Sequence, residues 1–206
     1  MQNKTGEILG RIKETLNTAQ LGFRDLVQGP PERKTAGLWN LIVFGRAITN
    51  VLQNLRSVEP GFDGWYNKYV EEMKSDPLMR FFYMSRSEVL KEGKLEHYTR
   101  THIKEFHYPQ DLQRFGPPPP NAKGFFMGDR NGGSGWEVQL PDGSVEKLYV
   151  DLPVDIAEVS LGFPNSPESH LGRKIEDPSI ENLGGLYFSY LERLVASAEE
   201  EFRTGG

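Results

Sequence analysis

The sequence contains no cysteine among its 206 residues. Disulfide bonds, cysteine-containing zinc sites and thiol nucleophiles are therefore excluded, and a reducing compartment is compatible with this composition. No segment approaches the roughly 20 consecutive apolar residues that span a bilayer, and the first residues lack the apolar run of a secretion signal. We accordingly expect a soluble, cytoplasmic protein that does not associate with membranes.

The sequence also lacks an excess of positive charge. Its net charge is −5, which argues against a protein dedicated to nucleic-acid binding. The charge is uneven, because residues 1–104 contain 16 basic and 12 acidic side chains, whereas residues 105–206 contain 8 and 17. A mildly basic first half beside an acidic second half is compatible with self-association, although an ordinary solvated surface is the simpler explanation.

Apolar residues recur at helical spacing in five segments of the chain. We predict helices at residues 5–28, 35–56, 63–75, 77–92 and 179–203, which together form a bundle from residues 5–93 and 179–203. Gly45 lies inside the second of these helices, where glycine costs about 1 kcal/mol relative to alanine. A second helix crossing close to Gly45 would explain why this cost is tolerated.

The fourth predicted helix has the clearest signals at its ends. Asp76 can accept hydrogen bonds as its N-cap, Pro77 suits the first helical position, and Gly93 suits the position just past the end. Its apolar positions lie near one face, and Arg86 interrupts them. An arginine in that place reaches solvent, pairs with an acid, or contacts a partner.

The segment before the last helix has the pattern of β-structure. Residues 98–107 alternate roughly as a strand does, 125–127 and 154–159 indicate further short strands, and 136–140 with 145–150 form the clearest hairpin. Residues 117–120 are four consecutive prolines, which we interpret as a stiff spacer. The sequence thus predicts an α+β fold in a single domain, a mainly α-helical bundle with a β-rich insertion at about 96–165 before the C-terminal helix.

Residues Arg86 to Gly93 resemble a degenerate form of the Arg-Asn-x-x-x-His motif of the HEPN superfamily. The resemblance implies a helical bundle that is often dimeric, and many members are ribonucleases that cleave RNA without a metal. Ser87 stands where that motif has asparagine, and Lys91 stands where it has histidine. Lysine titrates near pH 10.4 and cannot exchange protons at neutral pH without deep burial. The resemblance therefore implies a non-catalytic member, with Arg86 and Lys91 as candidate binding residues.

A purely structural interpretation of the same helix end remains open. Arg86 would then pair with Glu88 or Glu92, and Lys91 would be favourable simply because it is a cation near a helix C-terminus.

The histidines do not predict a metal site. His97, His102 and His107 are five residues apart, so on a strand successive members would point to opposite faces. Arg100, His102 and Lys104 share one face of that strand and are candidate phosphate-contacting residues, although an ordinary exposed strand face explains them equally well. No nucleotide-binding glycine motif is present, and we expect no cofactor.

Three functions are compatible with these features. The first is a non-catalytic helical interaction or regulatory protein, forming a homodimer or binding another protein. The second is a metal-independent ribonuclease that uses Arg86, with a proton supplied by His97 or His102, which would make RNA a partner. The third is a small-molecule sensor whose pocket lies in the aromatic β-rich insertion.

Overall fold

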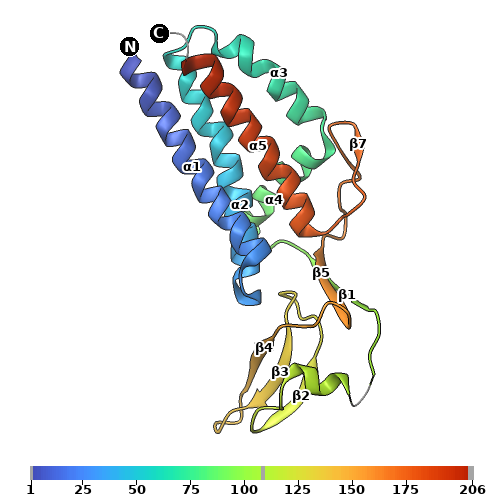
Figure 1. Cartoon of the computed structure of the whole chain (residues 1–206). Coiled ribbons are helices and arrows are strands. Elements are labelled where there is room, and N and C mark those ends of the chain that lie inside the picture. Colours follow the sequence, from blue (N-terminus) through green and yellow to red (C-terminus); the bar gives the residue numbers. More distant parts are fainter. Residues whose placement is uncertain (1, 108–109, 204–206) are drawn as a thin grey trace. The chain divides into compact units, whose positions relative to one another are not determined.

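The computed structural model describes residues 2–107 and 110–203 (Figure 1). The chain divides into two compact units. The helical unit contains residues 1–29, 33–95 and 165–206, and the β unit contains residues 30–32 and 96–164. The α+β fold class is confirmed, because five α-helices and short antiparallel strands are present in the described residues.

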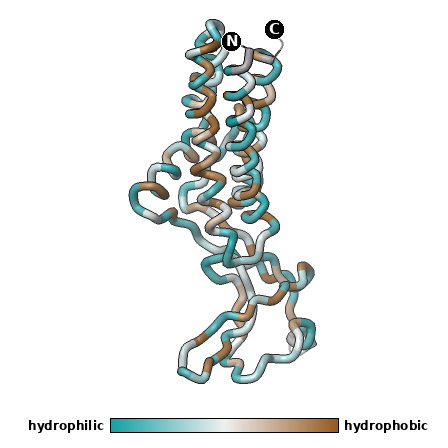
Figure 2. Tube along the Cα trace, turned by 90° about the vertical axis from the view of Figure 1, so that its left-hand side faces the viewer, coloured by the Kyte–Doolittle hydropathy of each residue, from teal (hydrophilic) through white to brown (hydrophobic). Residues whose placement is uncertain are grey.

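The bounds of the helices follow the predicted segments with one displaced start. They are α1 (Gln2–Gln28), α2 (Pro31–Leu52), the 3₁₀ helix η1 (Gln53–Ser57), α3 (Phe62–Ser75), α4 (Pro77–Glu92) and α5 (Ile180–Arg203). The second helix begins four residues before the predicted start at Thr35, since the fixed backbone angle of Pro31 suits a first helical turn. Figure 2 shows hydrophobic and hydrophilic residues interleaved along these helices.

Two glycines allow α1 and α2 to approach closely. A Cβ atom added at Gly37 would lie 2.6 Å from the backbone nitrogen of Leu26 and 2.7 Å from the carbonyl oxygen of Gly22. One added at Gly22 would lie 2.7 Å from the backbone nitrogen of Leu41. The two helices therefore pack backbone against backbone at this crossing.

Gly45 occupies a similar close crossing between α2 and α5. An added Cβ would lie 2.6 Å from Cε1 of Tyr187 and 3.0 Å from Cδ1 of Leu191. The predicted explanation for Gly45 is confirmed, because its missing side chain provides the space that the Tyr187 ring occupies.

The last helix packs on the first, as its periodicity predicts. Phe23 of α1 stacks on Phe188 of α5 with ring centroids 5.6 Å apart. Lys13 pairs with Glu199 at 2.7 Å. The C-terminal helix α5 is thus part of the same core as α1 and α2, although the β unit separates them in sequence (Figure 1).

The ends of α4 are as the sequence predicts. The Asp76 side chain accepts a hydrogen bond from the Met79 amide, Pro77 occupies the first turn, and Gly93 has a left-handed backbone with φ of 63°. The short strands β6 (Ser169–His170) and β7 (Arg173–Lys174) form a hairpin in the helical unit, which the sequence pattern did not indicate. Leu171 and Gly172 form its turn, with φ values of 48° and 73°.

The β unit contains two antiparallel sheets. One pairs β1 (Tyr98–Ile103) with β5 (Ala157–Gly162), and the other has the order β2 (Ala122–Phe126), β3 (Ser134–Gln139) and β4 (Val145–Val150). The hairpin predicted at 136–150 is confirmed as β3 and β4, with Trp136 opposite Leu148. The first strand ends at Ile103, four residues before the predicted end at His107. The core of the β unit contains Phe115, Ile156 and Ala157.

Candidate functional site

The helical unit contains a groove of about 700 Å³ between α2, α3, α4 and α5, which we call the bundle groove. Its apolar lining includes three methionines, one on α3 and two on α4: Met73, Met79 and Met84. Tyr66, Tyr187 and Leu191 are buried side chains that also line it. Tyr83 and Met84 lie at its open side, with 55% and 61% of their surfaces exposed. A cavity of this size is typical of ligand sites.

The charged lining of the bundle groove is entirely basic. Arg46, Arg56, Lys74 and Arg80 line it, and no acidic residue does so in the described part of the chain. Arg56 pairs with Asp63 and Lys74 pairs with Glu71, but both pairs are more than half exposed on each side. Exposed pairs of this kind contribute little and exchange readily for other partners.

Arg46 is held in place by neutral groups. Its guanidinium donates to the Thr49 hydroxyl and lies 5.3 Å from the centroid of the Tyr83 ring. Burial raises the pKa of Tyr187, and the positive charge of Arg46 offsets this only in part. Burial likewise raises the pKa of Tyr66. Both phenols therefore stay neutral at physiological pH, so the groove keeps its positive charge.

A second cavity, of about 660 Å³, lies beside the β6–β7 hairpin and α5. His170 lines it, and behind His170 the buried Asp76 carboxylate accepts three hydrogen bonds. The donors are the Met79 amide at 2.9 Å, the Leu171 amide at 2.6 Å and Nδ1 of His170 at 3.1 Å. The Nε2 atom of His170 is buried without a hydrogen-bond partner. Asp76 therefore joins the start of α4 to the hairpin, and we interpret this cluster as structural.

The candidate residues at the end of α4 lie apart from both cavities. Arg86 is half-buried, and its Nε atom is buried without a hydrogen-bond partner. No ion pair joins Arg86 to an acid within residues 2–107 and 110–203, and Glu92 pairs with Lys94 at 3.6 Å. Among the described residues, Arg86 therefore pairs with neither Glu88 nor Glu92. Lys91 is exposed in the last turn of α4.

The basic residues of β1 are exposed, and their charge is partly neutralised. Arg100 lies 5.9 Å from the Tyr98 ring centroid. His102 is opposite Glu158 in the sheet register. Lys104 follows the strand, pairs with Glu158 at 3.2 Å and donates to the Val154 carbonyl at 2.9 Å. This arrangement is typical of a solvated strand face with mixed charge.

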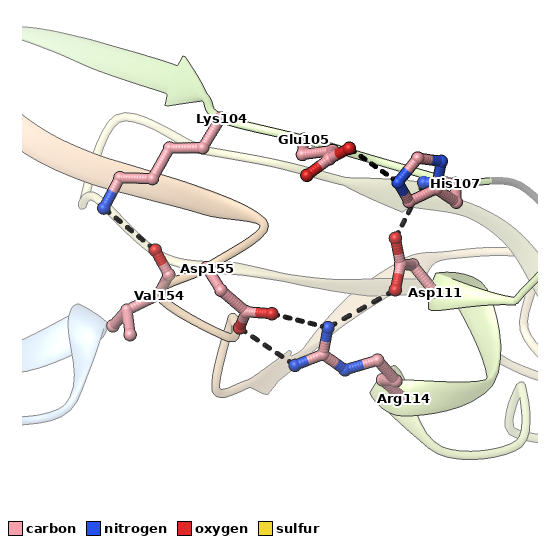
Figure 3. A network of polar contacts seen from close by, with 7 residues as sticks. All are labelled: Lys104, Glu105, His107, Asp111, Arg114, Val154 and Asp155. Carbon is pink, nitrogen blue, oxygen red and sulfur yellow. Dashed lines mark hydrogen bonds and ion pairs between the residues drawn. The ribbon is translucent and has the colours of Figure 1, made fainter.

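Beyond Lys104, a polar network joins the chain that leaves β1 to the chain that enters β5 (Figure 3). Arg114 donates to both carboxylate oxygens of Asp155, at 2.8 and 2.9 Å, and this contact lowers the pKa of Asp155. The His107 amide donates to Asp111 at 2.7 Å and lowers the pKa of that carboxyl group. His107 itself contacts Glu105 at 2.8 Å. Since each acid is paired within the network, we interpret it as structural.

Metal ligands do not converge in the described residues, where no group of three His, Asp or Glu side chains could hold an ion. A ring nitrogen of His97 contacts the carbonyl oxygen of Arg130 at 2.8 Å. In the glycine-rich loop of residues 128–135, the Asp129 carboxylate already has partners, because it accepts hydrogen bonds from Lys147 at 3.0 Å and from Tyr149 at 2.8 Å. It also accepts from two loop amides, of Asn131 and Gly133.

The hydrogen bonds of Asp129 predict an acid-sensitive loop. Burial opposes its ionisation, yet its four donors outweigh that cost and lower its pKa from the ordinary 3.8. The stability that Asp129 contributes is thus fully present above about pH 4. It is lost as the pH falls through the lowered pKa. We expect the amide resonance of Gly133 to titrate with a midpoint below 3.8 in an NMR pH series, and a midpoint above that value would contradict the assignment.

None of the groove residues was singled out from the sequence. Arg46 and Arg80 are isolated cations within amphipathic helices, and their shared lining depends on how α2 and α4 pack. The sequence feature that could have indicated the groove is the number of methionines and tyrosines beside the apolar faces of α3 and α4. Such residues indicate an incompletely covered apolar face.

The fold and the groove define a class: an α+β protein whose helical unit carries a basic, methionine-lined groove. The chain belongs to the family of bacteriophage lambda protein ea47, whose family model matches residues 30–139, more than half of the chain. It is 36% identical over 70 residues to protein ea47 of Escherichia phage lambda, a match covering 34% of this chain and 17% of that protein. No solved structure matches.

These matches correct the resemblance drawn from Arg86 and Lys91. The family shown is that of ea47, and nothing in the comparisons indicates the HEPN superfamily. An arginine followed five residues later by a lysine near a helix end is a common pattern, which explains why it misled. Among the described residues, no helix is both long and apolar enough to cross a bilayer.

Proposed function

We propose that this chain is a non-catalytic interaction protein whose bundle groove binds an anionic, partly apolar partner. The observation that carries this proposal is the groove lining, in which four cations surround an apolar floor without any acid among the described residues. Because Arg46 and Arg80 form no ion pair within this part of the chain, a negative group would not have to displace an internal acid. Charge complementarity of this kind favours both capture and specificity.

Among the described residues, the Asp76–His170 pair is buried, which supports binding over catalysis. Lys91 is exposed in the last turn of α4 and lies outside both cavities. His170 directs Nδ1 at Asp76, and its other ring nitrogen is buried away from solvent. A general base must reach its substrate within hydrogen-bond distance, and buried His170 does not. The ribonuclease alternative, with Arg86 and a proton from His97 or His102, stays a prediction.

The other expectations from the sequence stay predictions. A homodimer remains compatible with the exposed apolar residues of α4, and a cytoplasmic location remains compatible with the lack of cysteine. The small-molecule sensor whose pocket lies in the aromatic β-rich insertion likewise stays a prediction. Light scattering at micromolar concentration tests the dimer, and a mass that stays monomeric would contradict it.

The groove can be tested with an anionic aromatic probe. We expect 8-anilinonaphthalene-1-sulfonate to bind the folded chain saturably, and the double variant Arg46→Glu, Arg80→Glu to bind it at least about tenfold more weakly, a loss of about 1.4 kcal/mol. Fluorescence titration measures the affinity, and circular dichroism checks that the variant is folded. The matched control is Arg11→Glu, since Arg11 is an exposed cation on α1 away from the groove. Equal affinities for all three proteins would refute the proposal.

A further inference from the structure

We infer that the bundle groove binds an acidic amphipathic helix of a protein partner, about three turns long, an inference that rests on the proposed function. Its first support is the length over which the groove cations are spread. The 3₁₀ helix η1 continues α2 without a break, because Leu52 between them keeps helical angles, with φ of −52° and ψ of −39°. The Cα atoms of Arg46 and Arg56 are therefore roughly 15–20 Å apart along one axis, at about 1.5–2.0 Å per residue.

This spread does not match a single anionic group. A single phosphate or carboxylate contacts the lining at one point, whereas the four cations come from α2, η1, α3 and α4. A helix of about ten residues covers the roughly 15 Å between the Cα atoms of Arg46 and Arg56, since it also rises about 1.5 Å per residue. Acids placed at its two ends would then contact Arg46 and Arg56, while Lys74 and Arg80 contact acids along its flanks.

The apolar lining favours a helical face over stacked bases. Met73, Met79 and Met84 are unbranched and flexible, and methionine-lined grooves accommodate amphipathic helices of differing sequence. Single-stranded RNA would need exposed rings on which its bases could stack. Tyr66 and Tyr187 are each only 4% exposed, which leaves Tyr83 as the accessible ring of the groove.

The electrostatic balance of the chain also favours an acidic protein segment. The groove is locally basic, although the chain as a whole carries a net charge of −5. A nucleic acid extends well beyond a groove of this length and would meet acids such as Asp63 and Glu71, which pair with Arg56 and Lys74. A short helix confines its negative charge to the basic lining.

The experiment compares four fluorescently labelled probes by anisotropy. The first is a helix-forming peptide of about 15 residues, with leucines on one face and glutamates on its flanks. The second has the same composition without an apolar face, the third has lysine in place of each glutamate, and the fourth is a single-stranded RNA of about ten nucleotides. We expect the first peptide to bind at least about tenfold more tightly than each of the others.

Two variants place that binding in the groove. Met84→Glu adds a negative charge at a side chain that is 61% exposed, so folding should be unaffected. Leu21→Glu is the matched control, because Leu21 is 57% exposed on α1. We expect about a tenfold loss of peptide affinity for Met84→Glu and no change for Leu21→Glu. Raising the ionic strength from about 0.01 to 1 M should weaken the binding, since the Debye length falls from roughly 30 to 3 Å.

The outcomes separate this inference from the function on which it rests. If the anilinonaphthalene probe binds through Arg46 and Arg80 but the acidic amphipathic peptide does not bind, the inference is overturned and the proposed function stands. If neither binds, both are overturned. Tighter binding of the RNA, or self-association of the chain that Met84→Glu abolishes, would assign the groove to another occupant and also overturn the inference.

Discussion

Replacing Gly37 by alanine is expected to destabilise the helical unit by about 2 kcal/mol, whereas the same replacement at Gly10 stabilises it. The new Cβ at Gly37 would lie 2.6–2.7 Å from backbone atoms of Leu26 and Gly22. Backbone cannot move aside without separating the two helices, and overpacking of this kind costs about 1–3 kcal/mol or more. The better helix propensity of alanine recovers only about 1 kcal/mol of that.

Gly10→Ala is the control because it isolates helix propensity. A Cβ at Gly10 meets nothing within 4 Å, although Gly10 lies in the same α1 helix as Gly22. Thermal unfolding followed by far-ultraviolet circular dichroism should show Tm falling by roughly 4–8 °C for Gly37→Ala and rising by roughly 2–4 °C for Gly10→Ala. Equal shifts in the same direction would show that α1 and α2 do not pack backbone against backbone.

The contrast between these two glycines explains how far the fold could be predicted from the sequence. Helical periodicity located all five α-helices, and the Asp76, Pro77 and Gly93 signals located both ends of α4. These are local properties, because capping and amphipathicity depend on residues a few positions apart. Which glycine lies at a crossing depends on the other helix, so Gly10 and Gly37 look alike in the sequence.

The β6–β7 hairpin was missed for a related reason. Each of its strands has two residues, too short for an alternating pattern, and its turn places Leu171 at φ of 48°. Leucine is uncommon in the left-handed backbone conformation. The turn persists here because the Leu171 amide donates a hydrogen bond to the Asp76 carboxylate, which lies 95 positions earlier in the sequence. A long-range acceptor therefore determines a local conformation that the local sequence disfavours.

The candidate site was less predictable than the fold. Reasoning from single segments favoured Arg86, Lys91 and the β1 residues, because each belongs to a recognisable short pattern. The bundle groove draws Arg46 from α2 and Arg80 from α4, and no spacing rule relates positions on different helices. Only their shared packing against α3 and α5 brings these cations together.

Replacing Asp76 by alanine is expected to have the largest effect on stability, a loss of about 3–4 kcal/mol. The carboxylate is 3% exposed and accepts hydrogen bonds from two backbone amides and from His170. Loss of the N-cap costs about 1 kcal/mol. Each buried donor left unsatisfied adds about 1–3 kcal/mol, and the Leu171 turn loses the contact that stabilises its left-handed backbone. At roughly 2–4 °C per kcal/mol, Tm should fall by about 6–16 °C.

Two further variants separate the cap from the connection to the hairpin. The side chain of Asp76→Asn can still accept a hydrogen bond from the Met79 amide, but its amide nitrogen cannot accept one from the Leu171 amide. We therefore expect about half of the stability loss of Asp76→Ala. Asp63→Ala, which removes an exposed carboxylate from the first turn of α3, should cost less than about 1 kcal/mol. Amide hydrogen exchange gives the decisive measurement: in Asp76→Asn the Leu171 amide should exchange faster while the interior of α4 stays protected. Unchanged exchange at Leu171 would mean that Asp76 caps α4 without holding the hairpin.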